Sequence, residues 1–177
     1  SGSEYAVAYQ TVIDVSMSDT TKAFLYPNMY CNFNDSTKAI AKGESIAANA
    51  DDDLGVVSAV YHYVASNVKY DSQKAATVEN DYKPTVDATL SSNTGICFDY
   101  ASLMACMLRT QGIPTRIEVG YAGTEYHAWI GVYIEGTGWI DDIITFDENK
   151  WTLMDPTLAS YADKSTIKTN WDSRSTF

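Results

Sequence analysis

The sequence predicts an α+β fold in which helices pack on one side of an antiparallel sheet. Apolar residues with helical spacing occur up to Arg109, and alternating apolar residues become the rule only after Pro114. Helices and strands do not follow one another regularly, as they would in a parallel βαβ protein. The length of 177 residues is enough for one domain with a sizeable core.

The chain before residue 70 is predicted to form an extended segment and two helices. Apolar residues partly alternate from Tyr5 to Val15, which favours an extended segment. Ser36 can cap a helix that continues to Ala48. Three aspartates at 51–53 suit the positive end of the next helix. That helix carries one apolar stripe, formed by Leu54, Val57, Tyr61, Val64 and Val68.

A polar stretch and a third helix follow. The stretch from Asp71 to Asn93 contains Pro84 and lacks sustained periodicity, so we interpret it as a long loop. A helix is predicted from Cys97 to Arg109, with its start capped by Asn93 or Thr94 and its end marked by Gly112. Long ordered loops often carry function, and this one leads directly to Cys97.

The second half of the chain is predicted to form strands. Apolar residues alternate over 116–121 and 126–134, and shorter apolar runs occupy 139–144 and 151–154. In the strand over 126–134, His127, Trp129, Gly131 and Tyr133 share one face, and the intervening residues form the core face. The polar tail from residue 158 has no pattern that predicts an element.

Composition narrows the classes of function. The formal net charge of −11 disfavours binding to nucleic acid, and no apolar run is long enough for a membrane span. Three cysteines without a CxxC pair and two histidines predict neither a disulfide framework nor a zinc site. We therefore expect no metal or organic cofactor. Abundant Thr, Ser, Asn and Tyr with few Lys and Arg predict an exported protein, extracellular or at the cell surface.

Cys97 is the strongest candidate for a catalytic residue. Unpaired N–H groups and the positive end of the dipole at a helix start stabilise a thiolate, which predicts a lowered pKa. His127 and Asp155 follow in the order expected for a base and a group that orients it. The N–H of Cys97 is also a candidate donor to an oxyanion.

Other aspartates, cysteines and the second histidine are weaker candidates than these three. Asp141, Asp142 and Asp147 compete with Asp155 as the partner of the histidine, but Asp155 is preferred because it ends an apolar strand. His62 lies beside the buried stripe of its helix without a motif around it, so no chemistry is assigned to it. Cys106 is half a helical rotation away from Cys97 and is predicted to be core, and Cys31 either pairs with it or stays free.

Several motifs in the correct order resemble those of transglutaminase-like domains. The residues Gly95-Ile96-Cys97-Phe98-Asp99-Tyr100-Ala101 and the later Gln111-Gly112-Ile113-Pro114 resemble the nucleophile helix of this family and the approach to its next strand. His127-Ala128-Trp129 resembles the histidine strand, and Trp151 with Met154-Asp155-Pro156-Thr157 is similar to the aspartate segment. The resemblance covers roughly residues 52–160.

The resemblance implies a papain-like fold and a Cys-His-Asp arrangement. Cys97 would be the nucleophile, His127 the general base and acid, and Asp155 the residue that orients the imidazole. We expect residues 1–35 to form an extended segment packed on the same domain and residues 36–177 to form the transglutaminase-like catalytic domain, with a single domain overall. One departure is the presence of Ile130 and Gly131, where many bacterial relatives have a polar residue and a glutamate.

The expected function is thiol-dependent amide chemistry on a protein or peptide substrate through a thioester. Hydrolysis by a cysteine peptidase or amidase is preferred, because a transferase must also keep water from the thioester. The alternatives are a transglutaminase that crosslinks proteins and, in another class, a binding module that keeps the fold without turnover.

Overall fold

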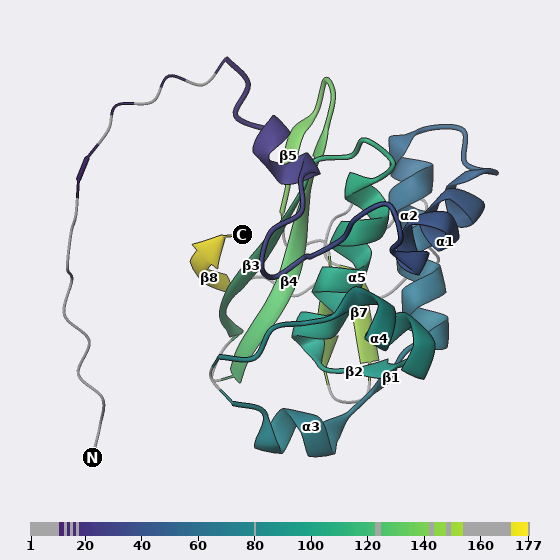
Figure 1. Ribbon diagram of the computed structural model, residues 1–177, viewed down its shortest axis with the longest axis vertical. Coiled ribbons are helices and arrows are strands. Elements are labelled where there is room, and N and C mark those ends of the chain that lie inside the picture. Colours follow the sequence, from purple (N-terminus) through teal and green to yellow (C-terminus); the bar gives the residue numbers. More distant parts are fainter. Residues whose placement is uncertain are drawn as a thin grey trace.

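The computed structural model places one long helix between a sheet and a layer of further helices. The central helix is α5 (Cys97–Arg109), which contacts strands β3 (Thr115–Ala122) and β4 (Glu125–Ile134) on one side. Figure 1 shows the helical layer lying on one side of these strands. The structure describes residues 11, 12, 14, 16, 18–79, 81–122, 125–141, 144–147, 150–153 and 171–176.

The helical layer comprises helices from the first half of the chain. Helix α5 contacts α1, α2 and α4, and α1 also contacts α2. Asp52 caps α2 by accepting a hydrogen bond from the Gly55 N–H at 2.7 Å. The layer consists of α1 (Lys38–Ala47), α2 (Asp53–Asn67) and α4 (Val86–Ser92). Two shorter helices, η1 (Lys22–Leu25) and α3 (Ser72–Thr77), lie outside it.

The main sheet has the antiparallel strand order β5-β4-β3-β8, where β5 is Gly138–Ile140 and β8 is Trp171–Thr176. Two smaller sheets accompany it. Strands β1 (Lys69–Tyr70) and β2 (Thr94–Gly95) pair in parallel, and β6 (Ile144–Asp147) pairs antiparallel with β7 (Lys150–Leu153). The predicted α+β class, with helices on one side of an antiparallel sheet, is confirmed.

The core lies between α5 and the sheet. Residues from Asp99 to Arg109 on α5 are all buried, because helices cover one side of α5 and strands cover the other. On β4, the predicted core face is confirmed, since Ala128, Ile130, Val132 and Ile134 all belong to the hydrophobic core. The opposite face is not simply exposed, however. Trp129 is only 1% exposed and lies opposite Glu118 of β3.

The sequence reading of residues 71–93 as a long loop was wrong. This stretch contains α3 and α4, and Asp71 caps α3 by accepting a hydrogen bond from the Lys74 N–H at 2.8 Å. Both helices are of seven residues or fewer, so neither gives a sustained periodic pattern. Asn93 ends α4 in the left-handed conformation with φ of 53°.

Other expectations need smaller corrections. Ile96, rather than Asn93 or Thr94, occupies the N-cap position of α5. The apolar run over 139–144 is divided between β5 and β6, and the tail contains the unpredicted strand β8. The extended segment predicted from Tyr5 to Val15 lies almost entirely outside the described residues.

Candidate active site

Cys97 and His127 line the same pocket, which has a volume of about 570 Å³. This volume is typical of pockets that hold a small molecule or a substrate side chain. The pocket is bounded by the turn before α1, by α3 and the residues after it, by the start of α5, and by β3 and β4. The lining residues are Met29, Tyr30, Tyr70, Ala75, Val78, Glu79, Asp81, Tyr82, Lys83, Ile96, Cys97, Phe98, Val119, Tyr126, His127 and Ala128.

The small parallel sheet fixes the chain just before Cys97. The Lys69 N–H donates to the Asn93 carbonyl at 2.8 Å, and the Asp71 N–H donates to the Gly95 carbonyl at 2.9 Å. Cys97 then occupies the first position of α5. The side chain is therefore held at a helix start, as the sequence predicts, and the residue is partly exposed.

The electrostatic surroundings of Cys97 differ from the expectation. Burial raises the pKa of the Cys97 thiol, and the Asp99 carboxylate adds to this effect, whereas hydrogen bonds from the backbone N–H groups of Ala128 and Phe98 oppose it. The net direction is upward, so the expectation of a lowered pKa was wrong. The N–H groups at a helix start do stabilise a thiolate, but here they are outweighed by desolvation and by a carboxylate two residues away.

His127 lies on β4, immediately before the residue whose N–H reaches the sulfur. It pairs with Gly120 of β3 in the antiparallel register. Because the Ala128 N–H hydrogen-bonds to Cys97, the strand that carries His127 passes directly over the start of α5. Helix α5 and strand β4 also pack against each other.

Asp155, the third predicted residue, lies outside the described residues. Of its competitors, Asp141 is engaged elsewhere: its carboxylate accepts a hydrogen bond from the Arg116 guanidinium at 2.5 Å. Arg116 also pairs with Glu118 and lies over the Trp139 ring. Asp142 and the side chain of Asp147 fall outside the described part of the chain.

The departure from the family pattern after His-Ala-Trp has a structural reason. Ile130 points into the core and is 1% exposed. A Cβ atom on Gly131 would lie 2.6 Å from the Asp141 carboxylate and 3.1 Å from Arg116 Nε. A side chain at residue 131 would therefore displace the Asp141 carboxylate from its present position beside Arg116.

Asp99, Lys74 and Tyr82 make a polar cluster behind Cys97 that the sequence reading did not identify. Asp99 is fully buried, and it accepts hydrogen bonds from Lys74 Nζ at 2.7 Å and from the Tyr82 hydroxyl. One signal was available, since an acidic residue at the third position of a predicted helix often bonds back to its cap. Its long-range partners have no such signal.

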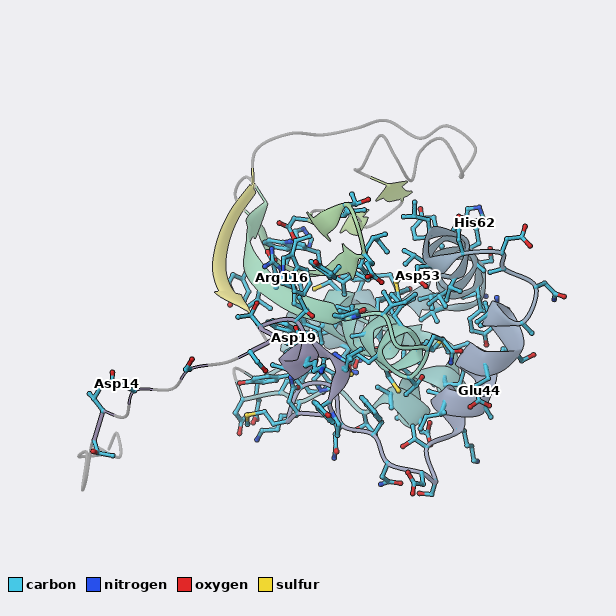
Figure 2. All side chains as sticks on the ribbon, turned by 90° about the horizontal axis from the view of Figure 1, so that it is seen from above. Asp14, Asp19, Glu44, Asp53, His62 and Arg116 are labelled. Carbon is cyan, nitrogen blue, oxygen red and sulfur yellow. The ribbon has the colours of Figure 1, made fainter. Side chains whose placement is uncertain are left out.

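The remaining cysteines and His62 lie away from the pocket. Cys31 and Cys106 are both free thiols that are 0% exposed, so the core role of Cys106 is confirmed and Cys31 is not paired with it. Burial raises the pKa of Cys31 to about 11. His62 is exposed on α2, and Figure 2 shows it at the periphery of the helical layer, across the molecule from β8.

None of the helices that the structure describes combines the length and the apolar character required to cross a bilayer. Within the same described residues, no three or more His, Cys, Asp and Glu side chains come together in an arrangement suited to a metal ion.

Two curated relatives share part of this sequence. Protein YebA of Bacillus subtilis, which is uncharacterized, is 24% identical over 174 residues, covering 82% of this chain and 23% of YebA. A protein-glutamine gamma-glutamyltransferase of Pseudomonas aeruginosa is 32% identical over 68 residues, covering 30% of this chain and 10% of that protein. The chain therefore spans about a quarter or less of these relatives.

Two solved structures share the fold. One is a "Putative Cysteine Protease" from Cytophaga hutchinsonii, with a TM-score of 0.58 and 24% identity, covering 91% of this chain and 55% of that one. The other is the periplasmic domain of TgpA from Pseudomonas aeruginosa, with a TM-score of 0.54 and 24% identity, covering 71% and 46%. The model of the transglutaminase-like superfamily matches residues 40–156, well over half of the sequence. This chain therefore belongs to the transglutaminase-like superfamily.

Proposed function

We propose that this protein cleaves amide bonds of a protein or peptide substrate through a thioester on Cys97. The observation that supports this most is the placement of Cys97 and His127 in the lining of one pocket, with the Ala128 N–H on the sulfur. A thiol and an imidazole on facing elements are the minimum for general-base activation of a sulfur nucleophile. Residues 36–177 would form the catalytic domain and residues 1–35 a segment packed on it.

In the first half-reaction, His127 takes the thiol proton and the sulfur attacks the amide carbonyl carbon. The carbonyl oxygen becomes an oxyanion, to which the N–H of Cys97 at the start of α5 is a candidate donor. The C–N bond then breaks, and the imidazolium returns the proton to the departing amine. The products are a thioester on Cys97, a free amine and a neutral His127.

In the second half-reaction, the same imidazole takes a proton from water. The hydroxide attacks the thioester carbonyl, the C–S bond breaks, and the sulfur recovers the proton from His127. The carboxylate of Asp155 is proposed to hold the imidazole in the orientation that both transfers require. If a primary amine replaced water, the same steps would give a new amide, which is the transglutaminase reaction.

Alkylation with iodoacetamide tests the pairing of Cys97 with His127. We expect Cys97 to be the only cysteine labelled in the folded protein, because Cys31 and Cys106 are completely buried. Labelling should accelerate as the pH rises, and His127→Ala should slow it at least tenfold at pH 7 and shift the rise to higher pH. Mass spectrometry locates the adduct, and the rate is measured across the pH range.

His62→Ala is the matched control, because His62 is the other histidine of the chain and is exposed on α2, outside the pocket lining. It should label at the rate of the unmodified protein. Labelling of Cys97 that does not depend on His127 would contradict the proposal and would favour a binding module that retains the fold.

The partition between hydrolysis and transfer is measured with glutamine-containing peptides, with and without a primary amine. We expect release of free acid to exceed amine incorporation, because the pocket is partly open to water. Amine incorporation that outruns hydrolysis would instead assign the chain to crosslinking. Fractionation of the source cell tests the expected extracellular or cell-surface location.

A further inference from the structure

One wall of the pocket is formed by a single segment, residues 72–83. It contains α3 and the turn after it, and it contributes Ala75, Val78, Glu79, Asp81, Tyr82 and Lys83 to the pocket lining. Figure 1 shows α3 at the lower edge of the molecule, apart from the helical layer. The position of this wall therefore depends on how the segment is attached to the rest of the molecule.

Two side chains of this segment bond to the first turn of α5, because Lys74 Nζ and the Tyr82 hydroxyl both donate to the Asp99 carboxylate. The start of α3 is also bonded to Asp71, just before the segment. Lys74 Nζ also donates to the Tyr82 hydroxyl at 2.6 Å and lies 4.4 Å from the centre of the Tyr82 ring. The two side chains thus hold each other as well as the carboxylate.

Asp99 is built into the first turn of the nucleophile helix. Its Oδ2 accepts a hydrogen bond from the Ile96 N–H at 2.8 Å, which satisfies a donor at the helix start. A Cβ atom on Gly95 would lie 2.6 Å from the Asp99 Cβ, so the glycine makes room for this side chain. The Asp99 side chain is 1% exposed, and a carboxylate buried so deeply needs hydrogen-bond donors around it.

We propose that Lys74, Tyr82 and Asp99 form a clasp that fastens the pocket wall of residues 72–83 to the helix turn that carries Cys97. The three are positioning residues: they set where the substrate is bound relative to the sulfur, and they do not touch the reacting atoms. The inference deepens the proposed function and rests on it for its kinetic consequences. The fastening itself concerns the structure alone.

The clasp has a second effect, which is electrostatic. The Asp99 carboxylate raises the pKa of the Cys97 thiol, because it opposes a second negative charge nearby. Lys74 places a positive charge 2.7 Å from that carboxylate and offsets part of its field. Besides Lys74 and Asp99, the charged or titratable residues are those that line the pocket: Glu79, Asp81, Lys83, Cys97, His127 and the tyrosines Tyr30, Tyr70, Tyr82 and Tyr126.

The protonation states support the direction of these bonds. Burial alone would lower the pKa of Lys74, but hydrogen bonds to Asp99 and Tyr82 outweigh it and raise that pKa. Burial, followed by the hydrogen bond to Asp99, raises the pKa of Tyr82. The ammonium and the phenol therefore keep their protons, and both act as donors to Asp99.

The test uses three variants of the full chain. Tyr82→Phe removes one donor and keeps the ring. Lys74→Met removes the positive charge and leaves the carboxylate buried. Lys74→Met with Asp99→Asn also removes the negative charge, and the asparagine oxygen can still accept from the Ile96 N–H. Hydrogen exchange, the pH dependence of Cys97 alkylation, and kcat and KM are measured for each.

Each variant has a distinct expected result. Tyr82→Phe should accelerate hydrogen exchange in residues 72–83 and raise KM about threefold to tenfold, with kcat changed less than KM. Lys74→Met should raise KM further and move the rise of Cys97 alkylation to higher pH. The double variant should return the alkylation profile to that of the unmodified protein, or to lower pH, while KM stays high.

Lys42 and Tyr63 supply matched controls, because Lys42 Nζ lies 4.5 Å from the centre of the Tyr63 ring on the helical layer. Lys42→Met and Tyr63→Phe should leave exchange in residues 72–83, KM and alkylation unchanged. The clasp is overturned if Tyr82→Phe and Lys74→Met exchange like these controls. If instead exchange changes as expected but no peptide is turned over by the unmodified protein, the proposed function fails and the clasp stands.

Discussion

Cys97 and Cys106 lie on the same helix in opposite environments. Cys97 is the first residue of α5, is partly exposed and lines the pocket. Cys106 lies in the second half of the helix, is 0% exposed and belongs to the hydrophobic core. Burial raises the pKa of both thiols. Hydrogen bonds from backbone N–H groups oppose that rise at Cys97 but do not act on Cys106.

The difference follows from position in the helix. In the middle of a helix every N–H is bonded to the preceding turn, so a thiol there gains nothing from the backbone. At the start of a helix the N–H groups have no such partner, and the sulfur can use them. The comparison teaches that the free N–H groups at a helix start lower the pKa of a thiol, and that burial decides how much of this lowering remains.

Replacement of each cysteine by alanine gives the largest expected effects. Cys97→Ala should reduce turnover by roughly 10³-fold or more, because no thioester can form, with little change in stability. Cys106→Ala should leave turnover within about twofold but lower the free energy of unfolding by about 1–2 kcal/mol, because it opens a small cavity. Turnover and denaturant unfolding are measured on both.

The contrast between Cys97 and Cys106 fails if Cys106→Ala abolishes turnover in a protein that remains folded. It also fails if Cys97→Ala retains turnover. Either result would place the nucleophile outside the first turn.

Asp155→Asn tests whether Cys97 depends on a His127 imidazole that the Asp155 carboxylate orients. We expect turnover to fall by about 10²–10⁴-fold with an unchanged melting temperature, because the imidazole loses its orienting carboxylate. Alkylation of Cys97 and turnover are measured together. Asp147→Asn and Asp142→Asn are the matched comparisons, and if one of these rather than Asp155→Asn removes activity, that residue orients His127.

Much of the fold could be predicted because its long elements have strong local patterns. The helix predicted from Cys97 to Arg109 has those bounds in the structure, and the strand predicted over 126–134 matches β4 closely. Both elements carry a full set of core residues, so their periodicity is clear. Two of the family motifs lie on these same elements, and they contain Cys97 and His127.

Short elements and long-range polar contacts could not be predicted in the same way. Helices α3 and α4 are too short to show a period. Helix α3 is capped by the Asp71 side chain, and α4 packs against α5. The partners of Asp99 are 25 and 17 residues away in sequence, and nothing local links them. The pKa of Cys97 was misjudged for the same reason, since desolvation depends on the packed structure.

Ser102→Ala gives the smallest expected effect, and it removes a hydrogen bond made by the buried part of α5. Ser102 is fully buried, and its hydroxyl donates to the Tyr30 carbonyl at 2.7 Å, which holds the turn that carries Met29 and Tyr30 against the helix. Loss of this bond should cost about 1 kcal/mol and lower the melting temperature by roughly 2–4 °C.

Because Tyr30 lines the pocket, the Ser102 variant also reports on the connection between the middle of α5 and its first turn. We expect Cys97 alkylation to be unchanged and KM to rise less than threefold. Ser66→Ala, at an exposed site on α2, is the matched control and should not lower the melting temperature. If Ser102→Ala slowed alkylation as strongly as His127→Ala, the reactivity of Cys97 would depend on the buried part of α5. The environments of Cys97 and Cys106 would then not be independent of each other.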